Sequence, residues 1–416
     1  MNILAVLYCY PPLLVPATMC YLKLLAGLRE TGFEVTVLTM DPDSFDARLK
    51  GMSDDTLVRL IPEGVKNRPV KCRESNILVR AIKRSGAGYR ILYRMFEPKG
   101  KEWYASSLNY LVKADLSRYD LILSCSQPHI NHLIGYHLKQ RTKRPWIAYF
   151  SDPWTDNPYT KYASEKIRRY NASLEGKVME CADAVLFTSE EMASFVMEKY
   201  PEDYKRKCSD LPHSFVPGWY ELTGEKALED RDGKIRVLHT GHFYGPRTPL
   251  PFLEAIAGLS REIDLAKRLE VRFFGAMDRK YHEFIEQEGL GGIVQVGKTI
   301  PYLETLAAMK NSDYLLLIDA PLKEHVESVF LPSKLIDYIG SRKPVIGITP
   351  GRGASARVLR ESGNLVCDIG APGNIRSAMR KAADRSLDLR PDNSAIAKYH
   401  YAVVTKKLKG IIEGLL

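Results

Sequence analysis

The sequence predicts an α/β fold made of two doubly wound domains, each built on a parallel sheet. Short continuous apolar runs, typical of strands buried on both faces, recur along the chain with helical stretches between them. The 416 residues are enough for two domains with separate cores. Apolar residues make up 45% and charged residues 26%, which excludes a disordered or collagen-like chain.

The first half opens with a βαβ unit. Residues 3–7 form an apolar run that Tyr10-Pro11-Pro12 ends, residues 18–31 have apolar positions at helical spacing, and residues 34–39 follow as a second strand. Further strands are expected at 121–124, 146–150 and 184–188. Together they predict a Rossmann-like first domain over residues 1–215.

The second half repeats this architecture without repeating the sequence. Its strands are expected at 235–239, 271–274, 293–296, 314–318 and 344–348. Residues 212–233, with Pro212, Pro217 and a charged run, are the best candidate linker, so the second domain is placed at 216–395. Residues 396–416 have an amphipathic helical pattern, and that helix could pack on either domain. Ligands of doubly wound sheets lie outside the carboxyl ends of the strands, so a cleft between two facing domains is the expected site.

Positive charge is concentrated in one segment. The chain has 60 Lys and Arg against 50 Asp and Glu, and residues 66–101 alone hold eleven basic and two acidic residues among apolar and aromatic ones. Such a segment suits an anionic membrane surface, although a solvated helix pair packed on its own domain is the alternative. No recognised nucleic-acid module accompanies the charge, so no nucleic-acid partner is expected. The proposed membrane-facing residues are Arg80, Lys83, Arg84, Arg90 and Arg94.

The cysteine pattern and the N-terminal residues predict a cytoplasmic protein. Seven cysteines occur without a C-x-x-C pair or a Cys/His cluster, which argues against a disulfide framework and a structural zinc site. Residues 3–22 lack charge, but three prolines interrupt them, so neither a signal peptide nor a spanning helix is expected. The protein would be peripheral on the inner face of the membrane if residues 66–101 dock there.

The most informative segment is residues 331–347, which read L-P-S-K-L-I-D-Y-I-G-S-R-K-P-V-I-G. Ser333 is placed to cap a helix, and Lys334 and Asp337 lie three residues apart, so both can face the same side. A lysine there can pair with a phosphate, and a carboxylate can accept hydrogen bonds from sugar hydroxyls. The alternative is a plain i,i+3 surface ion pair.

This segment resembles the donor-binding motif P-S-K-L-x-[ED]-Y, followed by G-x-P-V-I, of GT-B glycosyltransferases of family 4, the polysaccharide- and lipopolysaccharide-assembly type. The opening βαβ unit, Asp152-Pro153-Trp154, residues 240–247 and residues 297–302 also resemble family segments. These matches cover nearly the whole chain in the family's order. The resemblance implies the GT-B fold and transfer of a sugar from a nucleotide-sugar to an acceptor, with retention of configuration.

The resemblance also assigns roles to residues. Arg247 and Lys334 match the basic pair that binds the donor diphosphate and stabilises the leaving group. Asp337 matches the carboxylate that binds the ribose, and Asp152 lies where the acceptor would be positioned or its proton handled. Neither metal nor cofactor is implied. The remaining predicted site residues are Gly241, Thr299, Ile300 and Ser333 on the donor side and Trp154 on the acceptor side.

Two departures from the family pattern keep other functions open. The position eight residues before Asp337 is Val329 instead of a carboxylate, so Glu327 is proposed as its substitute in contacting the donor sugar. A Gly-Gly pair is replaced by residues 13–17, which include a proline that has no N–H to donate to a phosphate. A non-catalytic nucleotide-binding scaffold and a nucleotide-sugar epimerase of the same fold are therefore the alternatives. The acceptor expected for a transferase is a lipid-linked glycan.

Overall fold

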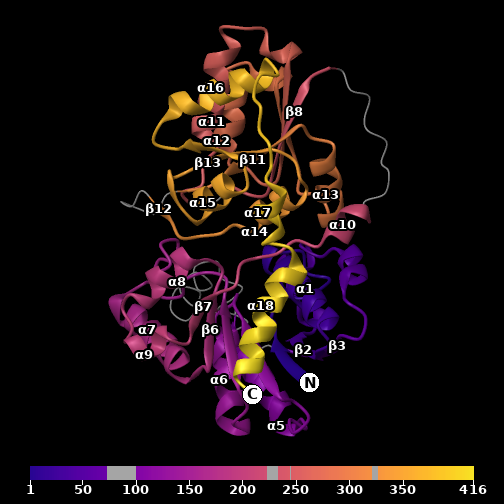
Figure 1. Cartoon of the computed structure of the whole chain (residues 1–416), viewed down its shortest axis with the longest axis vertical. Coiled ribbons are helices and arrows are strands. Elements are labelled where there is room, and N and C mark those ends of the chain that lie inside the picture. Colours follow the sequence, from indigo (N-terminus) through magenta and orange to yellow (C-terminus); the bar gives the residue numbers. More distant parts are fainter. Residues whose placement is uncertain (73–99, 223–232, 244, 321–326) are drawn as a thin grey trace. The chain divides into compact units, whose positions relative to one another are not determined.

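The computed structural model describes residues 1–72, 100–222, 233–243, 245–320 and 327–416. They form two compact units (Figure 1). Unit 1 comprises residues 1–212 and 401–416, and unit 2 comprises residues 213–400. Each unit is a parallel sheet with alternating helices, which confirms the predicted fold class of two Rossmann-like domains.

Unit 1 contains a seven-stranded sheet in the order β3-β2-β1-β4-β5-β6-β7, and all its strand pairs are parallel. Strands β1 to β3 extend the sheet in one direction and strands β4 to β7 extend it in the other, so the strand order reverses between β1 and β4. Strands β4 and β5 are buried along their whole length, as continuous apolar runs predict. The strands are β1 (Asn2–Val6), β2 (Glu34–Met40), β3 (Lys66–Val70), β4 (Leu121–Cys125), β5 (Trp146–Phe150), β6 (Ala184–Phe187) and β7 (Cys208–Asp210).

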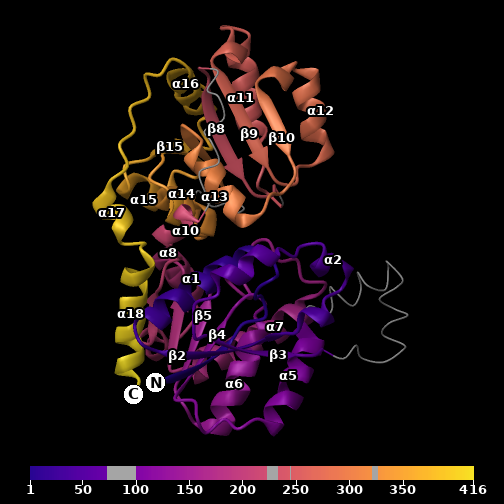
Figure 2. The ribbon, with the colours of Figure 1, turned by 90° about the vertical axis from the view of Figure 1, so that its right-hand side faces the viewer.

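The helices of unit 1 cover this sheet, and α5 and α6 pack against each other (Figure 2). Ser164 and Ser189 cap α7 and α8, because each hydroxyl accepts a backbone N–H of the first turn. Gly27 lets α1 and α18 approach closely, since a Cβ at Gly27 would collide with Thr405. The main helices are α1 (Pro16–Glu30), α5 (Lys101–Lys113), α6 (Ile130–Thr142), α7 (Glu165–Cys181), α8 (Glu190–Met197) and α18 (Tyr401–Gly414); α2 (Ala47–Lys50) and α9 (Glu202–Lys205) are short.

Unit 2 contains a six-stranded parallel sheet in the order β10-β9-β8-β11-β13-β15, so its growth reverses between β8 and β11. Strands β8, β11 and β13 are fully buried. The strands are β8 (Ile235–Thr240), β9 (Leu269–Phe274), β10 (Val294–Gly297), β11 (Tyr314–Ile318), β13 (Val345–Thr349) and β15 (Leu365–Asp368), and β12 (Glu327–Ser328) pairs separately with β14 (Arg352–Gly353).

The helices of unit 2 are α10 (Pro217–Glu221), α11 (Leu250–Ser260), α12 (Arg279–Gln287), α13 (Tyr302–Lys310), α14 (Ser333–Gly340), α15 (Ala354–Glu361), α16 (Pro372–Ala383) and α17 (Asn393–Ala397). Helices α11 and α16 pack together over an apolar core that includes Phe252, Val271 and Ile375. At the other end of the unit, Trp219 of α10 contacts Tyr302 of α13 edge to face.

Several segments differ from the predicted pattern. Residues 66–70 form β3, so the basic segment 66–101 begins as an edge strand of the sheet, where no strand was predicted. The linker region contains α10, whose Trp219 is buried in unit 2. The C-terminal stretch is broken between α17 and α18 rather than forming one helix.

The proposed membrane-facing residues lie outside the described residues; they are Arg80, Lys83, Arg84, Arg90 and Arg94. Within the described part of the chain, no helix combines the length and the apolar character needed to cross a membrane.

Candidate active site

The candidate site of unit 2 lies at the carboxyl ends of β8 and β11, where the strand order reverses. In doubly wound sheets, this reversal opens a crevice between neighbouring loops. Gly241 directly follows β8, and Asp319 directly follows β11. Arg247 lies in the segment between β8 and α11, and α14 brings Lys334 to the same place.

Lys334 supplies a buried amine to this site. Its Nζ is buried and has no hydrogen-bond partner among the described residues, although the rest of the side chain is half-buried. The amine lies against Gly241, because a Cβ at that glycine would collide with Nζ. Burial lowers the pKa of Lys334 to about 7; the Arg247 cation lowers it as well, while Asp319 opposes the shift. A buried amine of this kind is suited to an anionic ligand.

Asp319 anchors the Arg247 guanidinium beside this amine. The Asp319 carboxylate is fully buried, and its Oδ1 lies 3.3 Å from Nη2 of Arg247. The same oxygen accepts the backbone N–H of Ala320 at 2.9 Å. The second oxygen accepts the hydroxyl of Ser355 at 2.8 Å and that of Ser328 at 3.3 Å. The carboxylate is therefore held by its own loop and by groups from three other segments of unit 2.

Two glycines, in the loops after β8 and β9, allow these loops to approach each other closely next to Lys334. Gly241 has a φ of 113° and Gly275 a φ of 146°, both in the region that favours glycine. A Cβ at Gly275 would collide with the carbonyl of Gly241, and the Gly241 N–H donates to the Phe274 carbonyl at 2.7 Å. The position of the Lys334 amine thus depends on the absence of side chains at these two residues.

Substitution of Gly241 by alanine is expected to destabilise the fold by about 2 kcal/mol, because the new Cβ strains a positive φ and displaces the Lys334 amine. Chemical unfolding of the purified variant measures this loss. Gly373→Ala is the matched control, since nothing lies within 4 Å of a Cβ there. Equal stabilities of the two variants would contradict the close packing of Gly241 against Lys334.

Asp337 and Lys334 contact different parts of unit 2. Its carboxylate is buried and accepts the hydroxyl of Tyr302 at 3.2 Å, and its backbone carbonyl accepts the hydroxyl of Tyr220 at 2.7 Å. Tyr302 is the first residue of α13, directly after the loop that contains Thr299 and Ile300. Lys334 and Asp337 therefore do not form an ion pair with each other. Through these two side chains, α14 connects the loop after β8 with the region after β10.

The structure does not bring Glu327 into this cluster. Glu327 lies in β12 with an exposed side chain, and its carboxylate is 3.8 Å from Nη1 of Arg352 on the neighbouring β14. Ser328, the next residue, contacts Asp319 instead. Ser333 is the first residue of α14 rather than its cap, because Pro332 occupies the cap position.

Asp152, which was predicted to act on the acceptor, lies just beyond the carboxyl end of β5 in unit 1. Its Oδ2 accepts the side-chain amide of Gln127 at 2.7 Å and the hydroxyl of Ser151 at 3.2 Å. Trp154 is buried: its ring stacks on His129 with centroids 5.1 Å apart, and its Nε1 donates to Asn171 at 3.2 Å. Trp154 thus holds the loop that carries Asp152.

The loop after β1, where the family pattern has two glycines, is held by backbone hydrogen bonds. The N–H of Leu13 donates to the Tyr10 carbonyl at 3.0 Å, and that of Leu14 donates to the Met52 carbonyl at 2.7 Å. The N–H of Val15 donates to the Leu13 carbonyl at 3.2 Å, and Pro16 then begins α1. These N–H groups already have protein acceptors, so they are poorly placed to bind a phosphate.

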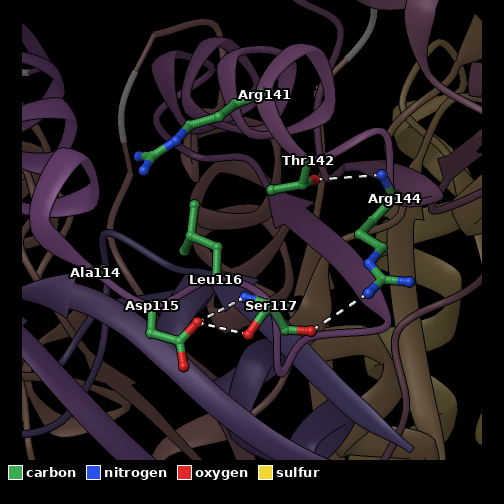
Figure 3. A pocket seen from close by; sticks show the side chains of 7 residues that line it. All are labelled: Ala114, Asp115, Leu116, Ser117, Arg141, Thr142 and Arg144. Carbon is green, nitrogen blue, oxygen red and sulfur yellow. Dashed lines mark hydrogen bonds between the residues drawn. The ribbon is translucent and has the colours of Figure 1, made fainter.

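A surface pocket of unit 1 does not belong to this site (Figure 3). It is lined by Ala114 to Ser117, before β4, and by Arg141, Thr142 and Arg144, before β5. It therefore lies at the amino ends of these strands, whereas Asp152 follows the carboxyl end of β5. The carbonyls of Leu111 and Val112 accept the Arg141 guanidinium, and the carbonyl of Ser117 accepts that of Arg144.

Sequence reasoning missed Asp319 and Tyr302. Asp319 directly follows the predicted strand 314–318, and that position was itself a signal, because ligand-contacting side chains of such sheets follow the strand ends. The contact of Tyr302 with Asp337 has no comparable signal, since the two residues lie 35 positions apart on different helices.

The comparisons with known proteins concern the family and the fold of the chain. Residues 17–205 match the family model described as the glycosyl transferase 4-like domain. No curated protein matches the chain.

Solved structures match the whole chain. WaaG, a glycosyltransferase involved in lipopolysaccharide biosynthesis, is 14% identical with a TM-score of 0.58, over 99% of this chain and 98% of that one. HepE of Anabaena, solved with UDP, is 12% identical with a TM-score of 0.62, over 100% of both chains. A putative UDP-N-acetylglucosamine 2-epimerase from Listeria monocytogenes is 12% identical with a TM-score of 0.58, over 99% of this chain and 95% of that one.

These identities are too low to transfer an activity, but the structural likeness establishes the fold and confirms the resemblance stated from the motifs. The chain has the GT-B fold, and its residues 17–205 match the model of the glycosyl transferase 4-like domain.

Proposed function

We propose that this protein is a glycosyltransferase whose second unit binds the diphosphate of a nucleotide-sugar. The observation that carries the proposal is the buried amine of Lys334, which lies beside the Arg247–Asp319 pair without a hydrogen-bond partner among the described residues. Burying a charged amine without a hydrogen-bond partner is costly, and an anionic ligand would remove that cost. The glycosyl transferase 4-like domain of unit 1 supports the same function.

The chemistry of sugar transfer explains this arrangement. Breaking the bond between the sugar and the phosphate leaves negative charge on the nucleoside diphosphate, and cations already in place stabilise that charge. Lys334 and Arg247 would supply these cations, and the positive end of the α14 dipole would add to their effect. Asp337 would accept the ribose hydroxyls, and the backbone of Thr299 and Ile300 would contact the base.

Uridine is the proposed base, because HepE was solved with UDP and the Listeria protein is described as acting on a UDP-sugar. Retention of configuration, a hexosyl donor and catalysis without a metal are proposed from the motif resemblance alone. Asp152 would position the acceptor hydroxyl or take its proton.

The proposed acceptor is a lipid-linked glycan at the inner face of the cell membrane, in cell-surface polysaccharide or glycolipid assembly. The support is the charge of residues 66–101, most of which lie outside the described residues. Their cations would pair with lipid phosphates, and their aromatic side chains would enter the headgroup region.

Two other functions have specific observations in their favour. The closed loop of Leu13 to Val15 favours a scaffold that binds nucleotide without transferring sugar, since its N–H groups are already bonded. The likeness to a putative UDP-N-acetylglucosamine 2-epimerase favours chemistry on the donor alone. An epimerase would convert the UDP-sugar into its epimer without any acceptor, whereas a scaffold would bind UDP and leave every UDP-sugar intact.

The nucleotide site is tested by thermal unfolding with UDP, GDP, ADP, CMP and the corresponding nucleotide-sugars at millimolar concentration. A ligand at 100 times its Kd stabilises the folded state by about 2.7 kcal/mol, which raises the Tm by several degrees. We expect this shift with UDP and expect Arg247→Ala to abolish most of it.

Glu327→Gln is the control, because this exposed carboxylate pairs with Arg352 and lies outside the cluster. Its UDP-dependent shift is expected to equal that of the wild type. A wild type that no nucleotide stabilises would overturn the proposed donor site.

A further inference from the structure

Asp319 is out of place in a site for a diphosphate, because its negative charge would repel the ligand. The carboxylate is fully buried, lies 3.3 Å from the Arg247 guanidinium and also acts on the charge of Lys334. A buried charge acts strongly on nearby charges, because the protein interior screens them far less than water does. Its presence therefore needs a reason that outweighs this repulsion.

The contacts of the carboxylate suggest that reason. One oxygen faces Arg247 and also accepts the Ala320 N–H, while the other accepts the hydroxyls of Ser328 and Ser355. Ser328 belongs to β12 and Ser355 to α15, so two elements hold the carboxylate through its second oxygen. The oxygen toward Arg247 is thus held in one orientation, and the guanidinium is held by it.

The two neighbouring cations, Arg247 and Lys334, need a negative charge beside them. The Arg247 cation lowers the pKa of Lys334 in the absence of ligand, and Asp319 is the group that opposes this effect. The other titratable groups that act on this position are His239 of β8 and His242 of the loop after it. Burial lowers the pKa of both imidazoles, so they are neutral at pH 7 and supply no counter-charge.

We propose that Asp319 is a positioning residue of the donor site: its buried carboxylate orients the Arg247 guanidinium and supplies the counter-charge that keeps Arg247 and Lys334 side by side before the diphosphate binds. The inference rests on the proposed function, since it assumes that these two cations bind a diphosphate. It predicts that Asp319 acts on the ligand through Arg247 and Lys334 and makes no favourable contact with the ligand itself.

The decisive experiment measures the Kd of UDP by calorimetry between pH 6 and pH 9 for the wild type, Asp319→Asn and Ser355→Ala. UDP binds best when Lys334 is protonated, so affinity falls as pH rises. Asp319→Asn removes the counter-charge and is expected to move the midpoint of this fall by about one unit to lower pH, the usual size of an effect from one nearby charge. Ser355→Ala keeps the charge and is expected to leave the midpoint within about 0.3 units of the wild type.

A double-mutant cycle tests the link to Arg247. If Asp319 acts through Arg247, then Arg247→Ala will weaken UDP binding less in the Asp319→Asn protein than in the wild type. A carboxylate that merely anchors β12 and α15 would lower the Tm in Asp319→Asn and in Ser355→Ala, with no shift of the pH midpoint and with additive effects on Kd. That result would overturn the inference and leave the donor site intact. A wild type that binds neither UDP nor inorganic pyrophosphate would overturn the proposed function and this inference together.

Discussion

Replacement of Lys334 by methionine is expected to weaken UDP binding about 100-fold at pH 7, because charge-assisted hydrogen bonds to a phosphate are among the strongest polar contacts of a binding site. Methionine fills a similar volume without the charge. The same substitution is expected to raise the stability of the free protein, because the buried amine has no partner among the described residues. The site would thus bind its ligand at a cost to the stability of the fold.

The pH dependence of this stability gain follows from the pKa of Lys334, which burial lowers to about 7 from an ordinary value of 10.5. Between these two values, the unfolded chain binds a proton that the folded protein does not, so wild-type stability rises with pH in this window. The advantage of Lys334→Met is therefore largest at pH 7 and below, and it shrinks as the pH approaches 10.

Urea unfolding of both proteins at pH 6.5 and pH 9.5 measures this effect, and calorimetry with UDP measures the loss of binding. Lys381→Met is the control, since Lys381 is an exposed lysine of α16 in the same unit. It is expected to change neither UDP binding nor the pH dependence of stability. A Lys334→Met protein that still binds UDP as the wild type does would contradict the role proposed for this amine.

The strands and the main motif were accessible from the sequence, because both depend on local patterns. Strands β4, β5, β11 and β13 are continuous apolar runs, and burial on both faces of a parallel sheet requires that composition. Lys334 was recognised from its neighbours in the segment 331–347. Edge strand β3 was missed because it reads K-N-R-P-V, a polar sequence with little apolar content.

The contacts of the site were not accessible in the same way, because they join residues that are distant in the sequence. Asp319 and Arg247 are 72 positions apart, and the choice of Arg247 as the partner of Asp319 depends on how the loops after β8 and β11 meet. Glu327 was proposed as a sugar contact from its distance to Asp337 along the chain. In a strand, neighbouring side chains point to opposite faces, and in β12 it is Ser328 that contacts Asp319.

Replacement of Asp152 by asparagine is expected to lower the rate of sugar transfer by about 100-fold or more, since a positioned acid or base contributes 10²–10⁴-fold to proton transfer. Asparagine has nearly the same shape, and its carbonyl oxygen can still accept the amide of Gln127. The change therefore removes the charge and the basicity with little effect on the loop. UDP binding is expected to stay as in the wild type, because the proposed donor contacts all belong to unit 2.

The rate is measured as release of UDP from a UDP-sugar that stabilises the wild type, in the presence of a total lipid extract as the source of acceptor. Asp156→Asn is the matched control: this carboxylate lies in the same loop, but it pairs with Lys199. The control is expected to retain transfer, so a loss confined to Asp152→Asn would separate a role in the reaction from a role in shaping the loop. If Asp152→Asn transfers sugar at the wild-type rate, Asp152 only forms the turn that joins β5 to Trp154. If both variants lose transfer equally, the integrity of the loop, and not the Asp152 carboxylate, is what the reaction requires.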